Sequence, residues 1–223
     1  MIGVVTFDLF SALLDSRTGA SAAFGRLAGD RGWGLTGVQL YDAWDPLNKA
    51  AQRDCVSWVP WRAPASRALT QVYATLDLDL DGDVTADVEM LVASMADWPL
   101  WPDVAAGLPR LAAEHRVGLL SNVDDEMFAR TPAAAFVDHD LALTSERLRA
   151  YKPHAAIYHR AVEAVGSMVH VATSARDVGG ALEAGIPVVR LRRPGHELDP
   201  DDRHPAHEVD SVDDLAAVVA KLD

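Results

Sequence analysis

The side chain best placed for chemistry in this sequence is the carboxylate of Asp8, which follows an apolar run over residues 2–7. A run of β-branched and aromatic residues is typical of a strand buried in a parallel sheet. A carboxylate at the carboxyl end of such a strand lies where open α/β sheets bind ligands, and burying it costs free energy. The position fits a nucleophile, and on this segment alone it fits a helix N-cap equally well.

Three further apolar runs, over residues 117–120, 141–143 and 169–172, are also followed by polar side chains. These side chains are Ser121, Asn122, Lys152 and Asp177. In a parallel sheet the carboxyl ends of all strands meet at one edge, so the four would gather around Asp8. The hydroxyl and the amide could bind a developing anion, and the lysine could keep a nucleophile ionised. The second aspartate could orient the lysine or position a hydrolytic water. Each residue alone also has a structural explanation, as a turn, a surface lysine or a helix cap.

Helical patterns separate the apolar runs and predict the fold. We expect helices over residues 104–115, 155–165 and 178–184, and a fifth strand over residues 188–191. Strands that alternate with helices are typical of a doubly wound parallel sheet. The sequence therefore predicts a Rossmann-like α/β fold.

Residues 16–97 interrupt this alternation, because they are rich in Ala, Leu and Trp with helical spacing and contain no convincing strand. Residues 98–102, with two prolines, would return the chain to the sheet. We expect an α/β core domain over residues 1–15 and 98–223, and a helical cap domain over residues 16–97 inserted after the first strand. Such an insert would cover Asp8, exclude water and shape the substrate pocket.

The composition is that of a soluble globular protein, with 223 residues, 49% of them hydrophobic, and a net charge of -13. This charge opposes binding to nucleic acids or anionic membranes, so a small molecule is the expected partner. No apolar stretch reaches the roughly 18 residues of a membrane-spanning helix, and residues 1–3 lead into the first strand without the charged start of a signal peptide, so neither feature is expected. The single cysteine, Cys55, cannot form an internal disulfide. A cytoplasmic location is therefore expected.

Two stretches near the C-terminus have predicted structural roles. Residues 194–207 are polar and are expected to form an exposed loop, and the spacing of His196, His204 and His207 is not that of a structural zinc site. Residues 211–222 predict a short amphipathic helix.

Four stretches of the chain resemble the motifs of the haloacid dehalogenase superfamily and occur in that family's order. They are residues 7–10, 120–122, 149–153 and 170–177. The resemblance is closest to the 2-haloacid dehalogenase branch. It implies that Asp8 attacks a substrate carbon and expels halide, and that water then hydrolyses the aspartyl ester at its carboxyl carbon. The expected substrate is a small carboxylic acid with a leaving group on the adjacent carbon.

Phosphatases of the same superfamily differ at two positions. They carry a second aspartate two residues after the first and an acidic residue at the start of the fourth motif, where this chain has Phe10 and Thr173. Because Mg²⁺ prefers several oxygen ligands, anionic ones included, the missing carboxylates favour a metal-free displacement without cofactor or metal site. Asp177 could still help to hold magnesium. A magnesium-dependent phosphatase acting on a small phosphate ester is the alternative.

One departure from the dehalogenase pattern concerns substrate charge. The family has an arginine in the cap that receives the halide and the substrate carboxylate, and the best alignment places Asp45 there. Lys49, Arg53 or Arg62 could substitute, although a lysine point charge and an arginine fork are not equivalent for carboxylate recognition.

Other departures surround the motifs: Ser11-Ala12 replaces a glycine and a threonine, Ser174 replaces an asparagine, and Arg176 replaces an aromatic residue. A changed substrate or a catalytically degenerate binding protein would explain them. The residues expected to contact substrate are Phe10, Ser11, Ser174, Tyr158 and Trp44. Helix packing is the alternative role for Trp44, and packing in the core is the alternative for Tyr158. The family resemblance also suggests a homodimer.

Overall fold

A computed structural model describes residues 3–78 and 84–222 of the chain. Six parallel strands form one sheet in the order β3-β2-β1-β4-β5-β6. The strands are β1 (Val4–Phe7), β2 (Arg116–Ser121), β3 (Ala142–Thr144), β4 (Met168–Ala172), β5 (Val188–Leu191) and β6 (His207–Val209). The predicted doubly wound parallel sheet is confirmed. Residue 2, which the sequence places in the first strand, lies outside the described residues.

The sixth strand was not predicted from the sequence. It begins at His207, the last residue of the stretch predicted to be an exposed loop, so that prediction is wrong at this residue. A strand of three residues, two of them polar, carries no readable alternation, and it pairs with β5 at the edge of the sheet.

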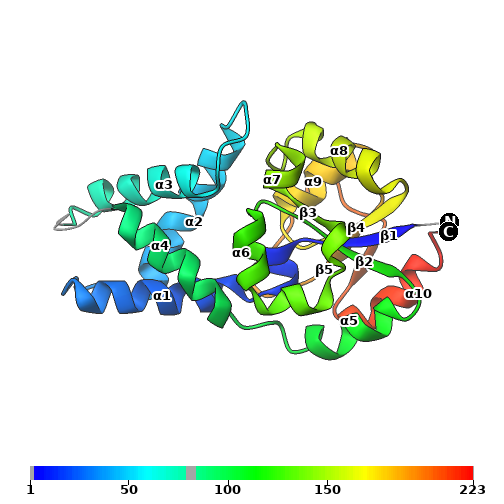
Figure 1. Cartoon of the computed structure of the whole chain (residues 1–223), viewed down its shortest axis with the longest axis horizontal. Helices are drawn as coiled ribbons and strands as arrows, with labels where there is room; N and C mark the ends of the chain where they lie inside the picture. The colour runs from blue at the N-terminus through cyan, green and yellow to red at the C-terminus, as the bar shows by residue number, and fades with distance from the viewer. Residues whose placement is uncertain (1–2, 79–83, 223) are drawn as a thin grey trace.

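Helices cover both faces of the sheet (Figure 1). On one face lie α5 (Val104–Ala112) and α10 (Leu215–Val219), and on the other lie α8 (Ala155–Val165) and α9 (Ala175–Glu183). The short helices α6 (Asp125–Arg130) and α7 (Ser145–Leu148) follow β2 and β3. Because side chains alternate along a strand, Val5 and Phe7 join one buried apolar cluster and Val4 joins the other. The predicted C-terminal helix is shorter than expected, because a 3₁₀ turn (Val212–Asp214) precedes α10.

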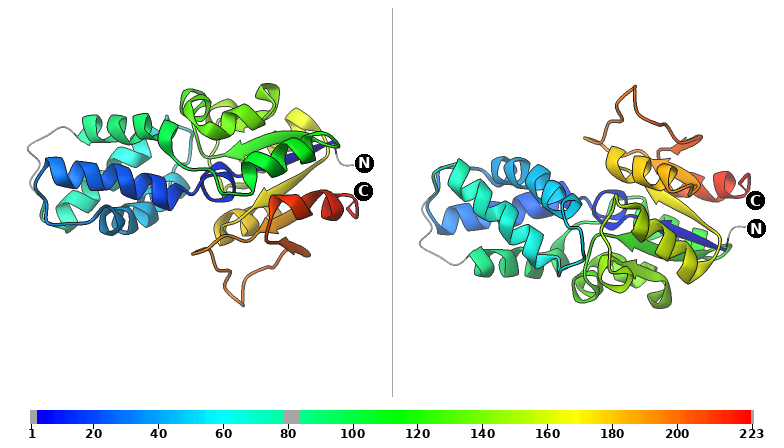
Figure 2. Two further views of the ribbon diagram at one scale, coloured as in Figure 1. Left: turned by 90° about the horizontal axis from the view of Figure 1, so that it is seen from below. Right: turned by 90° about the horizontal axis from the view of Figure 1, so that it is seen from above.

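Four helices follow the first strand: α1 (Ser16–Asp30), α2 (Gly37–Arg53), α3 (Arg62–Thr75) and α4 (Val84–Ser94). They pack on one another beyond the carboxyl ends of the strands, at the end of the molecule opposite the termini (Figure 2). We call these four helices the helical insert. A capping box of Thr36 and Gln39 begins α2. The boundaries of a separate domain, 16–97, stay a prediction, and residues 79–83 within them are outside the described residues.

The segment that leaves the sheet for the insert and the segment that returns from it lie side by side. Leu14 pairs with Leu100 as an antiparallel bridge, and the Trp101 N–H donates to the Leu13 carbonyl. A second contact joins the core to the start of α3, where the backbone N–H of Trp61 donates to Asp124 at 2.9 Å. The insert therefore contacts the core at two separate places in the chain.

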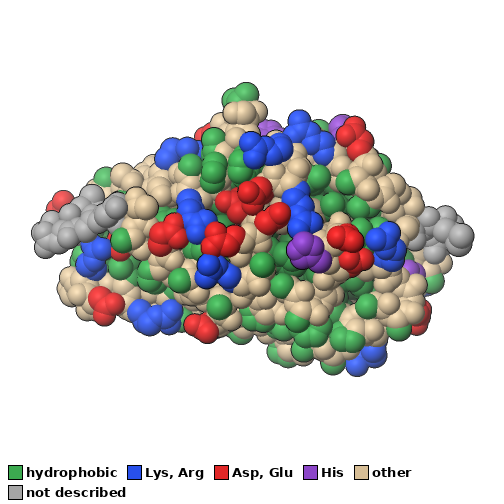
Figure 3. Space-filling model, in the orientation of Figure 1, with side chains coloured by type: hydrophobic (Ala, Val, Ile, Leu, Met, Phe, Trp, Pro, Cys, Tyr) green, Lys and Arg blue, Asp and Glu red, His purple; other side chains and the backbone are tan. Residues whose placement is uncertain are grey.

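Acidic and basic side chains lie interspersed over the middle of the face shown in Figure 3. Some of the charged surface side chains form ion pairs, such as Arg62 with Glu89. Exposed ion pairs contribute little to stability. Among the described residues no helix is long and apolar enough to cross a membrane.

Candidate active site

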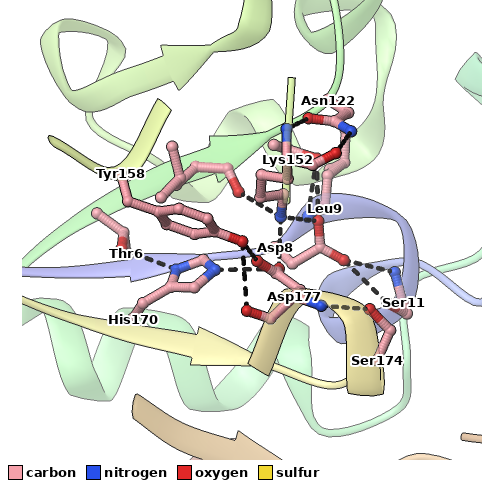
Figure 4. Close-up of polar contacts among 12 residues, drawn as sticks. Thr6, Asp8, Leu9, Ser11, Asn122, Lys152, Tyr158, His170, Ser174 and Asp177 are labelled. Carbon is pink, nitrogen blue, oxygen red and sulfur yellow. Dashed lines mark hydrogen bonds and ion pairs between the residues drawn. The ribbon is translucent and has the colours of Figure 1, made fainter. Parts of the chain in front are cut away.

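Asp8 lies at the carboxyl end of β1 and is 7% exposed. Its Oδ2 accepts hydrogen bonds from the hydroxyl and the backbone N–H of Ser11, at 2.9 and 3.3 Å. Its Oδ1 accepts from the ammonium of Lys152 at 2.8 Å and from the hydroxyl of Ser121 at 3.1 Å (Figure 4). Asp8 is thus both the N-cap of the turn Leu9–Leu13 and the centre of a polar cluster, so the two interpretations of its position are compatible.

Lys152 holds this cluster together from the segment that precedes α8. Its side chain is 3% exposed, and its ammonium donates to Asp8, to Asp177 and to the Leu120 carbonyl. An ammonium has three N–H groups, and these three contacts use all of them. Burial acts to raise the pKa of the Asp8 carboxyl, but the charge of Lys152 and the hydrogen bonds from Lys152 and Ser11 outweigh it. The pKa of Asp8 is therefore below its ordinary value, and Asp8 is ionised at neutral pH.

Asp177, in the first turn of α9, is 3% exposed, and both of its carboxylate oxygens are engaged. Oδ2 contacts the Lys152 ammonium and, at 3.0 Å, Nε2 of His170, and Oδ1 accepts from the Tyr158 hydroxyl at 2.8 Å (Figure 4). Burial acts to raise the pKa of Asp177, but the charges of Lys152 and His170 outweigh it and lower the pKa far below its ordinary value. This geometry suits Asp177 to orienting Lys152.

Tyr158 does not lie where the sequence placed it. The side chain is fully buried, is not among the residues that line the cavity beside Asp8, and contacts Asp177 from behind. In this structure the Tyr158 hydroxyl therefore contacts Asp177, and its predicted contact with substrate stays a prediction that this position does not support. The reason is packing, because the inward face of α8 covers the sheet and places this ring in the core.

The side chain of Asn122 fixes the backbone of Lys152. Its Oδ1 accepts from the Lys152 N–H at 2.6 Å, and its Nδ2 donates to the Lys152 carbonyl at 3.0 Å and to Gln52 of α2 at 2.9 Å. Both amide N–H groups are engaged, so donation to a substrate anion would require release of Gln52. The predicted role of Asn122 as an anion donor stays a prediction. The Ser121 hydroxyl is directed at Asp8.

A cavity of about 70 Å³ lies between Asp8 and the helical insert. It is lined by residues of both parts of the chain: Asp8, Phe10, Ser11, Ser16, Tyr41, Trp44, Asp45, Asn48, Lys49, Gln52, Trp61, Trp98, Ser121, Asn122, Lys152, Arg176 and Asp177. Three of the predicted contact residues, Phe10, Ser11 and Trp44, are among them. Ser174 is not, and its hydroxyl instead caps α9, so its substrate contact stays a prediction that this position does not support.

The cations proposed to replace the cap arginine differ in position. Arg62 forms an ion pair with Glu89, Arg53 is exposed, and neither lines the cavity. Lys49 does line it, but its ammonium pairs with Asp45 one helical turn earlier. Arg176 of α9 is a further cation that lines the cavity.

The residues at this edge of the sheet do not fit magnesium. Phe10 offers no carboxylate, the Thr173 hydroxyl donates to the Leu191 carbonyl at 2.7 Å, and the Lys152 ammonium already lies between Asp8 and the second aspartate. No group of three or more His, Cys, Asp or Glu side chains in the described part of the chain could hold a metal ion. The donor set lacks the additional anionic oxygens that a hard cation prefers. Independence from cofactors stays a prediction.

Sequence reasoning missed several residues that build the site. His170 lies beside Thr6 in the sheet register, and its Nδ1 is 3.0 Å from the Thr6 hydroxyl. The sequence did contain a signal for this pair, because each of the two residues is a polar residue inside an apolar run. Gln52 comes from the insert, where helical spacing alone does not show which side chains face the sheet.

An ionised carboxylate, a lysine and a small cavity at the carboxyl edge of a parallel sheet define an α/β protein with an enzyme-like site. The model of the haloacid dehalogenase-like hydrolases matches residues 2–185. The chain belongs to this family of hydrolases, and the recognition of the superfamily from its motifs is confirmed.

The solved structures with the same fold include 2-haloacid dehalogenases. The L-2-haloacid dehalogenase of Xanthobacter autotrophicus is 22% identical, with a TM-score of 0.83 and all of both chains covered. A defluorinating L-2-haloacid dehalogenase is 23% identical, with a TM-score of 0.83 over 98% of this chain and 95% of its own. The 2-haloacid dehalogenase of Pseudomonas syringae pv. Tomato is 24% identical, with a TM-score of 0.68 and all of both chains covered. No curated protein sequence matches the chain.

Proposed function

We propose that this protein hydrolyses the carbon–halogen bond of a small 2-halocarboxylic acid, with Asp8 as the nucleophile. The observation that carries the proposal is the ionised Asp8 carboxylate, held by Lys152, Ser11 and Ser121 against a small cavity. Similarity in fold to 2-haloacid dehalogenases supports the choice of leaving group.

In the proposed reaction a carboxylate oxygen of Asp8 attacks the carbon next to the substrate carboxylate. The carbon–oxygen bond forms as the carbon–halogen bond breaks, and the halide leaves with the bonding electrons. Water then attacks the carboxyl carbon of the Asp8 ester, releasing a 2-hydroxy acid and a proton and regenerating the carboxylate. Lys152 keeps Asp8 ionised before attack. Asp177 orients Lys152, because both carboxylate oxygens of Asp177 already accept hydrogen bonds from protein groups.

The size of the cavity supports a small substrate. One water-sized group needs roughly 10–15 Å³ of such space, so a cavity of about 70 Å³ accepts a molecule with only a few heavy atoms. Trp44, Asn48 and Gln52 of α2 form the wall opposite the sheet. In this proposal the helical insert is the cap that excludes water from Asp8.

The test is the release of halide from chloroacetate, fluoroacetate and 2-chloropropionate, beside the release of phosphate from an aryl phosphate, each with magnesium or with chelator. Asp8→Asn is the critical variant, and Asp54→Asn, which changes an exposed aspartate, is the matched control. Halide release that survives chelator, is lost in Asp8→Asn and is retained in Asp54→Asn supports the proposal. Magnesium-dependent phosphate release would instead identify the protein as a phosphatase. If Asp8→Asn retained both activities, Asp8 would have no role in the mechanism.

A further inference from the structure

Three cations line the cavity beside Asp8, and one of them has no carboxylate partner. Lys152 bridges the two aspartates of the site, and Lys49 pairs with Asp45. Arg176 forms no ion pair among the described residues. The lining therefore contains one cation that forms no ion pair with a carboxylate of the described residues.

The guanidinium of Arg176 is also incompletely hydrogen-bonded. One Nη1–H donates to the backbone carbonyl of Lys49 at 3.0 Å, whereas the buried Nε–H has no partner. A buried donor without an acceptor is costly, and an arginine fork matches the two oxygens of a carboxylate. Trp61, which is 2% exposed and also lines the cavity, has a buried Nε1–H without a partner as well. One buried acceptor on the lining, Asn48 Oδ1, is also without a partner, so the unpartnered donors outnumber the unpartnered acceptors and favour a ligand that supplies acceptors.

The position of Arg176 places such an acceptor close to the reacting group. Arg176 immediately precedes Asp177 in the first turn of α9, and Asp177 contacts the ammonium that holds Asp8. The amino end of a helix of this length also favours an anion. An anion bound by Arg176 in a cavity of about 70 Å³ would lie within the reach of a small acid from Asp8.

We propose that Arg176 binds the carboxylate of the substrate, with Trp61 Nε1–H as a further donor, and that it is the residue that selects acids over neutral compounds. This inference rests on the proposed function for the class of substrate. The charge that receives the substrate then comes from the sheet side of the cavity. Position 45 on the opposite wall is an aspartate already neutralised by Lys49.

The experiment measures binding separately from turnover. Titration calorimetry at pH 7 gives the dissociation constants of propionate, a carboxylate without a leaving group, and of propionamide, its neutral analogue. The proteins are the wild type, Arg176→Gln, Arg176→Lys and the control Arg53→Gln, an exposed arginine that does not line the cavity. The KM and kcat of halide release are measured for the same four proteins.

We expect Arg176→Gln to weaken propionate binding by roughly tenfold or more, as for the loss of a charged hydrogen bond, and Arg53→Gln to leave it unchanged. The dissociation constant of propionate for Arg176→Lys should lie between those of wild type and Arg176→Gln. None of the substitutions should change propionamide binding. KM for the haloacid should rise more than kcat falls. If Arg176→Gln does not fold, the same comparison is made with Arg176→Lys.

Equal propionate binding in wild type and Arg176 variants would overturn the proposal, and so would a wild type that binds no propionate. Propionate binding that depends on Arg176 in a protein that releases no halide would support this inference and refute the proposed function. The two proposals therefore fail through different outcomes.

Discussion

Replacement of Lys152 by Met should destabilise the protein more at neutral pH than at acid pH. The Lys152 ammonium is nearly fully buried and contacts both Asp8 and Asp177. Without it, two buried carboxylates remain close together without a compensating cation. Removing one partner of a buried ion pair costs about 3–5 kcal/mol. For a chain of this length each kcal/mol corresponds to roughly 2–4 °C in Tm, so the expected fall is roughly 6–20 °C at pH 7.

The direction of the pH dependence follows from the pKa shifts. In the wild type the pKa values of Asp8 and Asp177 are lowered, so both contribute stability above their ordinary pKa values, and this stability is lost as the pH falls through the lowered values. In Lys152→Met, burial and mutual repulsion raise these pKa values instead. The variant should therefore gain stability, relative to the wild type, as the pH is lowered from 7 towards 4.

The assay is urea and thermal unfolding of wild type, Lys152→Met and Lys221→Met between pH 4.5 and pH 8. Lys221 is exposed, and its substitution should change stability by no more than about 0.5 kcal/mol. The double variant Lys152→Met/Asp8→Asn removes one of the facing carboxylates and should recover part of the loss. A loss that is the same at every pH, or a double variant as unstable as the single one, would refute the electrostatic reasoning and leave only a packing effect.

Three further predictions concern stability and are measured by urea unfolding. In Gly37→Ala the new Cβ would lie 1.8 Å from a backbone oxygen of α1, so we expect a loss of about 1–3 kcal/mol, whereas Gly29→Ala has open space and should gain up to about 1 kcal/mol. Burial raises the pKa of Asp124 to about 6, so its ionisation destabilises the fold as the pH rises through 6, and Asp124→Asn should be more stable at pH 8 by at most about 3 kcal/mol and unchanged near pH 4. Tyr158→Phe removes the hydrogen bond to Asp177 and should cost about 1.5–3 kcal/mol.

Specific outcomes would contradict these three predictions. Equal stability of Gly37→Ala and Gly29→Ala would mean that α1 and α2 separate easily. A stabilising effect of Asp124→Asn that persists at pH 4 would locate its cause outside ionisation. No effect in Tyr158→Phe would mean that another group takes over the hydrogen bond to Asp177.

The sequence predicted the part of the site that the sheet itself determines. Asp8, Lys152 and Asp177 follow separate strands, and because parallel strands end at one edge, their convergence follows from topology without knowledge of side-chain packing. Tyr158 could not be placed in the same way, because helical spacing gives the face of α8 but not its neighbours. The three-residue strand beginning at His207 was too short for its pattern to be read.

The insert side of the cavity was harder to predict, because it depends on how four helices pack over the sheet. Trp44 was expected at the site, yet Asn48 and Gln52 line the same cavity and lie among many residues of similar type. Their exposure to the cavity follows from helix packing such as the contact of Trp44 with Trp61, whose ring centroids are 6.1 Å apart. Local propensity contains no information on such contacts between distant segments.

The charges around the cavity explain how an acidic protein could bind an anion and then expel another. Its lining carries as many carboxylates as cations: Asp8, Asp45 and Asp177 against Lys49, Lys152 and Arg176. A substrate anion would therefore enter a locally neutral site despite the net charge of -13. Formation of the proposed ester removes the charge of Asp8 and leaves the lining with one excess positive charge, which the bound carboxylate offsets. In the proposed reaction the halide would then leave a site in which the lining and the bound acid are neutral together, and Asp45 is one of the carboxylates that set this balance.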